Sequence, residues 1–312
     1  MSAAARDADW PALPLGEWRD TYATLHMWMQ IVGKTRLALA PMQNHWWQVA
    51  LYVTPRGLTT SAMPYRSRTF AVDLDFIDHA LMVQANDGAV RRLPLAPRSV
   101  ADFYAEYMAA LRSLGFEVAF RRRAPVEVET AIPFADDRQH ASYDADAANR
   151  CWRILVQTDR VLKRFRGRFL GKASPVHFFW GSFDLAATRF SGHRAPRHPG
   201  GAPNCPDYVM VEAYSHECSS CGFWPGGGAF PEPAFYAYAY PEPPGYGDRA
   251  VRPEGARYSA TAREFILPYE AVRSAAAPDE ALLQFLQTTY EAAADLARWE
   301  RAALDRPRPE WP

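Results

Sequence analysis

The residues with the clearest chemical potential lie in one stretch, YSHECSSCGFWPGGG, at positions 214–228. Cys218 and Cys221 form a Cys-x-x-Cys pair, the spacing found in structural zinc sites and in redox dithiols. His216 and Glu217 lie just before the pair, and both side chains can transfer protons near neutral pH. The stretch therefore suggests three kinds of chemistry, namely metal binding, thiol redox chemistry and acid–base catalysis.

The cysteine pair lacks the partners that either cysteine chemistry needs. A structural zinc ion takes four Cys or His ligands; Cys205 stands alone in the sequence, so His198 and His216 would both have to complete the set. A redox Cys-x-x-Cys normally opens a helix, and the sequence GFWPGGG after Cys221 cannot start one. A Cys/His structural zinc protein is therefore kept as a minor alternative, and both cysteines are expected to be small buried residues.

The histidines offer a second candidate site, because imidazole at a strand end can bind a metal or shuttle a proton. We predict that His177, His216, Glu217 and Asp184 are catalytic, with a divalent metal on His177 and His216 as the implied cofactor. Strand alternation separates His216 from Glu217, and His177 from Asp184, unless a strand end or a bulge brings them together. The competing interpretation is that each histidine hydrogen-bonds within an aromatic core.

Four further residues are predicted to bind the substrate: Arg189, Ser191, His45 and Trp224. Arg189 could receive a carboxylate or phosphate in bidentate geometry, although an ion-paired surface arginine would look the same in the sequence. Trp224 belongs to the glycine-rich tail, which would close over the ligand. The alternation in FYAYAY, at 235–240, is interpreted as a packed sheet face rather than a ligand platform.

The predicted elements that must position these residues occur twice in the same order. A helical pattern runs up to Gly33, which has the place of a glycine after a helix end, and several strands follow. Ser99 then caps a second helix. The second half repeats helix, strands and helix, with a strand predicted in PDYVMVEAYS and the last helix starting at Pro278.

Landmarks in the two halves also correspond, with His45 matching His177 and His79 matching His216. Identity is low, so a chance match between two α+β halves is the alternative. We predict an α+β fold of two pseudo-repeated halves, each helix–antiparallel strands–helix, packed as an intramolecular pseudo-dimer. The predicted segments are an extended or disordered N-terminus at 1–15, a first half at 16–119, a link at 120–142, a second half at 143–304 and a tail at 305–312. The second half carries two Pro/Gly-rich insertions, at 191–206 and 222–233.

Several longer motifs resemble those of a bacterial domain-of-unknown-function family. They are HFFWGSFDLAATRFSG, YSHE…GFWPGG, NHWWQVALYVTPRGLTTSAMPY and VDLDFIDH. The resemblance runs from about Trp18 to the last helix and implies a stand-alone cytosolic protein. It implies no known activity, cofactor or substrate. The family's motif is closer to YSHEVSSAGFWPG, so Cys218 and Cys221 depart from it.

The composition narrows the classes of partner. Of 312 residues, 35 are Lys or Arg and 35 are Asp or Glu, so no overall charge favours nucleic acid or an anionic membrane. The basic run at 160–172 straddles a predicted helix end, where positive charge is favourable in itself. No signal peptide or long apolar run is recognised, and four cysteines do not make a disulfide framework. We expect a cytoplasmic monomer or homodimer that binds neither nucleic acid nor membrane.

The favoured hypothesis is a small-molecule enzyme with a His/Glu-lined site between the two halves, acting with or without the help of a metal ion. The alternative is a non-catalytic module that binds a ligand or a protein through its aromatic insertions. None of the common nucleotide-binding, hydrolase or zincin motifs is present, so the sequence does not specify the reaction.

Overall fold

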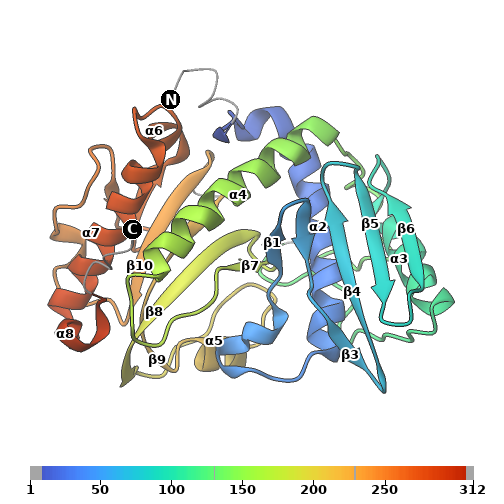
Figure 1. The fold of residues 1–312 in the computed structure, drawn as a ribbon, viewed down its shortest axis with the longest axis horizontal. Coiled ribbons are helices and arrows are strands. Elements are labelled where there is room, and N and C mark those ends of the chain that lie inside the picture. Colours follow the sequence, from blue (N-terminus) through green and yellow to red (C-terminus); the bar gives the residue numbers. More distant parts are fainter. Residues whose placement is uncertain (1–8, 130, 228–229, 307–312) are drawn as a thin grey trace.

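Two six-stranded antiparallel sheets lie edge to edge at the centre of the molecule (Figure 1). The computed structural model describes residues 9–129, 131–227 and 230–306. The first sheet has the order β1-β2-β4-β5-β6, with β3 paired to β4, and the second has the order β11-β12-β10-β9-β8-β7. Two backbone hydrogen bonds of 2.9 Å between Leu51 and Phe178 join the sheets at their edges.

The strands are short in the first sheet and longer in the second. The first sheet comprises β1 (Tyr52–Thr54), β2 (Gly57–Thr59), β3 (Met63–Tyr65), β4 (Arg68–Asp75), β5 (Ala80–Ala85) and β6 (Val90–Pro94). The second comprises β7 (His177–Phe179), β8 (Asp184–Arg194), β9 (His216–Trp224), β10 (Ala234–Tyr240), β11 (Arg257–Ser259) and β12 (Glu264–Pro268).

Helices cover the sheets and bury their apolar sides. The longer helices are α2 (Leu15–Leu39), α3 (Val100–Ser113), α4 (Ala145–Arg166) and α7 (Pro278–Leu296), and the short ones are η1 (Asn44–Val49), α5 (Asp207–Ala213), η2 (Tyr246–Asp248), α6 (Tyr269–Arg273) and α8 (Arg301–Leu304). Helices α2 and α3 pack beside the first sheet, and α4 and α7 pack on the second. Figure 1 shows α4 crossing the junction of the two sheets, where it contacts α2, β1, β8 and β9. The buried apolar residues form one continuous core from Trp10 to Trp299.

Several sequence predictions are confirmed. The fold is α+β with antiparallel sheets. Ser99 caps α3, its Oγ accepting a hydrogen bond of 3.1 Å from the Asp102 amide, and α7 starts at Pro278. Each half contributes one sheet, but the two strand orders differ, so the duplication and the pseudo-dimer remain predictions.

Other predictions of local structure are wrong. Gly33 lies inside α2, which continues to Leu39. Residues 207–213 form α5, which packs against η1, so tertiary contact overrides the strand preference of Val209 and Val211.

The two predicted insertions are partly strand. Strand β8 extends to Arg194, and β9 includes Gly222, Phe223 and Trp224. His216 therefore begins a strand rather than ending one, and Phe223 and Trp224 belong to the sheet rather than to a lid.

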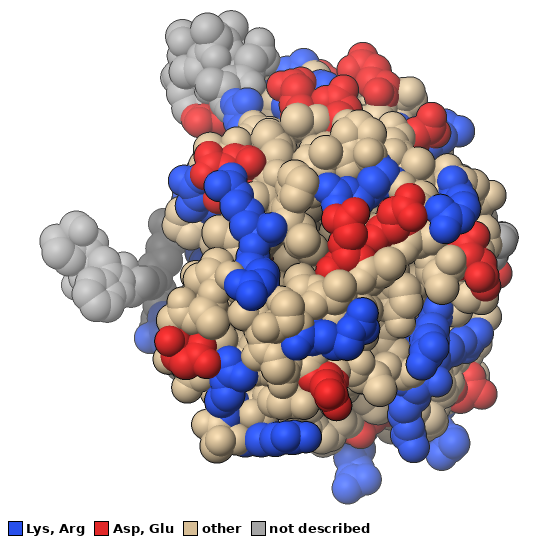
Figure 2. Space-filling view, turned by 90° about the vertical axis from the view of Figure 1, so that its right-hand side faces the viewer, with Lys and Arg blue, Asp and Glu red and all other residues tan. Residues whose placement is uncertain are grey.

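Charged side chains of both signs are interspersed on the face shown in Figure 2, which is the side where β6 and α3 lie in Figure 1. This matches a chain with equal numbers of acidic and basic residues. Among the described residues, no helix is both long enough and apolar enough to cross a membrane.

The unexpected place of Gly33 gives a test of the packing between α2 and the second sheet. A Cβ atom at Gly33 would lie 2.2 Å from the indole ring of Trp180, whereas one at Gly16 in the same helix would meet nothing within 4 Å. Alanine favours a helix over glycine by about 1 kcal/mol, but overpacking costs about 1–3 kcal/mol, and here a whole ring must move. We expect Gly33→Ala to lower the free energy of unfolding by about 2 kcal/mol in urea denaturation.

The matched control is Gly16→Ala, which we expect to raise the free energy of unfolding by about 0.5 kcal/mol. Equal effects of the two substitutions would contradict the packing of Trp180 on α2.

Candidate functional site

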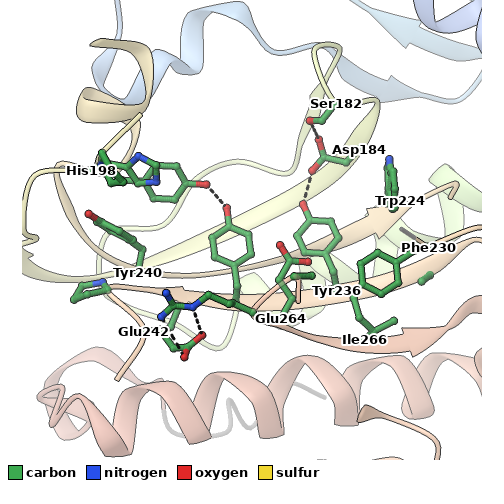
Figure 3. Close-up of a pocket in the computed structure, with 18 residues that line it drawn as sticks. Ser182, Asp184, His198, Trp224, Phe230, Tyr236, Tyr240, Glu242, Glu264 and Ile266 are labelled. Carbon is green, nitrogen blue, oxygen red and sulfur yellow. Dashed lines mark hydrogen bonds and ion pairs between the residues drawn. The ribbon is translucent and has the colours of Figure 1, made fainter. Parts of the chain in front are cut away.

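A cavity of about 880 Å³ lies on the face of the second sheet that points away from α4 and α7 (Figure 3). Side chains alternate along β10, so Phe235 and Ala237 enter the core while Tyr236, Tyr238 and Tyr240 project into the cavity. We call this cavity the tyrosine pocket. Polar and aromatic side chains make up much of its lining, among them Ser182, Asp184, His198, Tyr214, Trp224, Tyr236, Tyr238, Tyr240, Glu242, Arg263 and Glu264.

The sheet register brings Tyr236 to Asp184 across an intervening strand. Tyr236 pairs with Gly222 of β9, which pairs with Ala186 of β8. A Cβ at Gly222 would lie 2.6 Å from the Tyr236 hydroxyl, so glycine leaves the space that the phenol ring occupies. The Tyr236 hydroxyl donates to one oxygen of Asp184, and Ser182 Oγ donates to the other at 2.5 Å.

A second pair of phenols forms the opposite wall. The hydroxyls of Tyr214 and Tyr238 share a hydrogen bond of 2.7 Å. The ring of His198 stacks on Tyr214, with centroids 4.7 Å apart, and its Nδ1 accepts a hydrogen bond of 3.0 Å from the Gly200 amide. Burial lowers the pKa of His198, so the neutral ring carries its proton on Nε2.

Glu264 is the polar group of the pocket that lacks a partner. Its carboxyl makes no hydrogen bond or ion pair with any of the described residues. Burial, with a smaller contribution from the negative charge of Asp184, raises the pKa of Glu264 to about 7. Burial also raises the pKa of Asp184, against the effect of its two hydrogen bonds. At neutral pH, Glu264 is therefore poised between its acid and its carboxylate form.

A third carboxyl lies close to Ser182 and Asp184, outside the lining of the pocket. Glu127, in the segment between α3 and α4, lies over Gly181, where a Cβ would be 2.4 Å from its Oε1. Its side chain keeps contact with solvent, but the surrounding protein and the charge of Asp184 raise its pKa to about 7. Asp184 thus raises the pKa of both Glu127 and Glu264.

The rim supplies little compensating positive charge. Arg263 is the one lysine or arginine among the described lining residues, and it pairs with Glu242 at 3.4 Å. Glu242 also accepts a hydrogen bond of 2.6 Å from Tyr258. The interior of the pocket is therefore acidic and aromatic.

Of the residues predicted from the sequence, Asp184 and Trp224 line this pocket. Trp224 is fixed on β9 and contacts Phe230, with centroids 6.3 Å apart. Both lie on the same face of the sheet as Tyr236.

His177 is enclosed in an aromatic cluster and reaches neither water nor the pocket. Its ring is 0% exposed, lies against Trp47, Tyr52 and Phe179, and neither nitrogen has a hydrogen-bond partner. Burial, with smaller effects from two arginines, lowers its pKa to about 3.

His45 and His216 do lie together, with ring centroids 5.8 Å apart. Lys172 Nζ donates a hydrogen bond of 2.6 Å to His45 Nε2, and His45 Nδ1 donates to the Ala213 carbonyl at 2.9 Å. The ammonium group of Lys172 is therefore hydrogen-bonded to His45 Nε2, the nitrogen that would otherwise bind a metal ion. Trp47 lies between His45 and His177, so the predicted metal pair His177 and His216 is not brought together.

Glu217 and Ser191 form a small surface cluster outside the tyrosine pocket. Ser191 Oγ donates to Glu217 at 2.8 Å, and His193 lies 3.6 Å from the same carboxylate. Their polar groups therefore satisfy one another.

Arg189 lies on the helix side of the sheet, away from the pocket. Its guanidinium carbon is 3.5 Å from the ring centroid of Phe165 and 4.3 Å from that of Tyr290, and it donates to the Phe165 carbonyl. Burial lowers its pKa to about 10. Because 2% of this residue is exposed, it has no surface to offer a substrate.

The cysteines cannot share one metal ion. Cys218 and Cys221 are three residues apart on the regular strand β9, so their side chains point to opposite faces of the sheet. Cys221 Sγ donates a hydrogen bond to the Ala187 carbonyl. Burial raises the pKa of both thiols to about 12. Within residues 9–129, 131–227 and 230–306, no three His, Cys, Asp or Glu side chains cluster as metal ligands would. The structural zinc alternative is therefore not supported.

Sequence reasoning did not predict the residues that give the pocket its character, namely Ser182, Tyr214, Tyr236, Tyr238 and Glu264, and it considered His198 only as a zinc ligand. A signal was present in FYAYAY, whose alternation was interpreted as packing. Glu264, at the start of an otherwise apolar strand EFILP, was a second signal.

Comparison with known proteins identifies a family but no activity. A family model described as "Family of unknown function (DUF5996)" matches residues 10–306. The chain belongs to this family. No curated protein and no solved structure matches it. The family description names no reaction, so the function of this DUF5996 member is inferred from the tyrosine pocket and its surroundings.

The burial of His177 predicts a specific dependence of stability on pH. The folded protein holds His177 neutral down to about pH 3, whereas the unfolded chain takes up its proton near the ordinary value, about 6.5. The unfolded state binds more protons between these values, so stability is lost as the pH falls from about 6.5 towards 3, by up to about 1.4 kcal/mol per pH unit.

The unfolding free energy of the wild type should decline between pH 6 and pH 4. We expect His177→Phe to reduce the slope of this decline by up to about 1.4 kcal/mol per pH unit, which is the contribution of one proton. The control His193→Gln changes an exposed histidine and should leave the slope unchanged. A slope in His177→Phe equal to that of the wild type would contradict the dry environment of His177.

Proposed function

We propose that the tyrosine pocket binds a small organic cation, with Glu264 as its main counter-ion. The observation that carries the proposal is the unpartnered carboxyl of Glu264 inside an aromatic pocket. Glu264 is half-buried, and a carboxylate that has lost part of its hydration is normally paired, because the loss is costly otherwise. A ligand that brings a positive charge would supply the missing partner.

The charge balance of the pocket favours a cation over an anion. Asp184 and Glu264 face the interior, and Arg263 is already paired with Glu242. An anionic ligand would meet repulsion from both carboxyls, and the phenol hydroxyls of Tyr236 and Tyr238 are committed to Asp184 and Tyr214.

The aromatic walls suit an alkylated or guanidino group rather than a bare metal ion. The faces of tyrosine and tryptophan rings attract cations by about 0.5–2 kcal/mol each. Tyr236 and Tyr238 stack with centroids 6.1 Å apart, and Trp224 and Tyr240 flank them (Figure 3). A cavity of about 880 Å³ lies in the range of small-molecule sites, about 300–1,000 Å³.

Choline is a suitable first probe, with its uncharged carbon isostere 3,3-dimethylbutan-1-ol for comparison. We expect choline to bind at pH 8, with a change in tryptophan fluorescence from Trp224. Its affinity should fall about tenfold from pH 8 to pH 6, because a group with a pKa of about 7 goes from mostly ionised to mostly protonated over that interval.

Glu264→Gln keeps the shape of the side chain and removes the charge. We expect this variant to bind choline at least about tenfold more weakly than wild type at pH 8 and to lose the dependence on pH. Glu117→Gln, an exposed residue at a distance from the pocket, is the matched control. Equal binding of choline and its uncharged isostere, or undiminished binding to Glu264→Gln, would contradict the proposal.

A general acid–base enzyme is the second candidate, and the pKa of Glu264 near 7 favours it. A catalytic acid or base works best when its pKa lies near the operating pH. Glu264 would then transfer the proton, and Asp184, held by Ser182 and Tyr236, would stabilise positive charge on the substrate. Turnover of p-nitrophenyl esters or glycosides that survives in Glu264→Gln would exclude Glu264 from that role.

We further propose a cytoplasmic location, a monomeric or homodimeric state, and a common origin of the two halves. The proposed ligand is organic, so a divalent metal is not needed for binding.

A further inference from the structure

A second cavity, of about 510 Å³, lies on the other side of the turn formed by Trp180 and Gly181. We call it the lysine cavity. It is enclosed by α2, η1, α5, the segment after α3 and the loop before α5. Its apolar walls come mainly from Leu37, Trp46, Phe120, Trp180 and Tyr208.

Lys34 is the unusual residue of this cavity. It projects from α2 and is 4% exposed, and its amine makes no hydrogen bond or ion pair with any described residue. The nearest favourable contact is the Trp180 ring, 5.8 Å from Nζ. Burial, and next the charge of Arg122, lower the pKa of Lys34 to about 8.

The other titratable groups of the cavity do not neutralise Lys34. Burial raises the pKa of the Cys205 thiol to about 11, so it stays uncharged at neutral pH. Glu127 lies at the boundary with the tyrosine pocket and interacts with Ser182 and Asp184. Arg121 and Arg122 add positive charge at the exposed edge.

Arg122 is held in position for a ligand. Its guanidinium donates two hydrogen bonds of 2.9 Å to the carbonyl and side-chain oxygens of Asn204. Asn204 in turn donates to the Val128 carbonyl at 2.7 Å. A bidentate anchor of this kind fixes the guanidinium plane and leaves its remaining N–H groups for an acceptor.

We propose that the lysine cavity binds a small amphiphilic carboxylate. Its carboxylate group lies at Lys34, on the side of Arg122, and its apolar body fills the space between Trp46, Trp180 and Leu37. The ligand must be an anion because the buried ammonium group of Lys34 lacks a counter-ion. The rest of the ligand must be apolar because the walls of the cavity are apolar. Medium-chain fatty acids and aryl carboxylates share this chemistry, so both are tested.

The test measures binding of decanoate and of 2-naphthoate to the full-length protein by calorimetry at pH 7. Decan-1-ol and 2-naphthol are the uncharged partners of the two probes. We expect at least one carboxylate to bind about tenfold or more tightly than its partner, because a buried charge gains a counter-ion. The probe that binds distinguishes an aliphatic from an aromatic ligand.

Lys34→Met keeps an unbranched side chain and removes the charge. We expect it to reduce carboxylate binding at least about tenfold and to leave binding of the alcohol unchanged. Arg122→Gln should also weaken carboxylate binding, whereas Arg91→Gln, on the outer strand β6, should not. Glu264→Gln should leave decanoate and 2-naphthoate binding unchanged, which separates this site from the tyrosine pocket.

Three outcomes would overturn the proposal: neither carboxylate binds, the carboxylates bind no better than the alcohols, or Lys34→Met and Arg122→Gln both bind them as the wild type does. Should Lys34→Met fail to fold, the comparison of carboxylate with alcohol and the Arg122→Gln variant decide the matter.

Discussion

The register between β8, β9 and β10 is the constraint on which the candidate site depends. It places Tyr236 over Gly222, where no side chain obstructs the ring, and so allows the phenol to reach Asp184 two strands away. A shift by one residue would turn Tyr236, Tyr238 and Glu264 towards α7 and bring Phe235 and Phe265 to the open face. The apolar face of the sheet fixes the register, because those phenylalanines are buried in the core.

The same sheet separates two electrostatic environments. On the helix side, Arg189 is surrounded by Phe165, Phe169 and Tyr290, and its charge is balanced by aromatic faces rather than by a carboxylate. On the open side, Asp184 and Glu264 are close to aromatic rings but short of positive charge. On the other side of the Gly181 turn, the lysine cavity has an excess of positively charged side chains, namely Lys34, Arg121 and Arg122. The molecule thus presents an acidic and a basic cavity, separated by the turn and by Glu127.

Local signals predicted much of the fold, and tertiary contacts determined the rest. Ser99, Pro278 and the alternation in FYAYAY mark a cap, a helix start and a strand through interactions within a few residues. The places of Gly33 and Val209 depend on Trp180 and on η1, which are distant in sequence. Asp184 and Trp224 were predicted as site residues, but sequence alone did not show which face of the sheet α4 and α7 would cover. For that reason the alternating tyrosines of FYAYAY, Tyr236 among them, were assigned to packing.

Glu264 lacks a counter-ion, which in our proposal a cationic ligand supplies. Proton release on binding, measured at pH 7 by calorimetry in buffers of different ionisation enthalpy, decides between a charged and an uncharged partner for this carboxyl. The ligand is benzyltrimethylammonium, which has no proton of its own to lose. We expect release of roughly half a proton at pH 7, because a carboxyl with a pKa of about 7 is about half protonated, and almost none at pH 9. Binding without proton release at pH 7 would contradict the proposal.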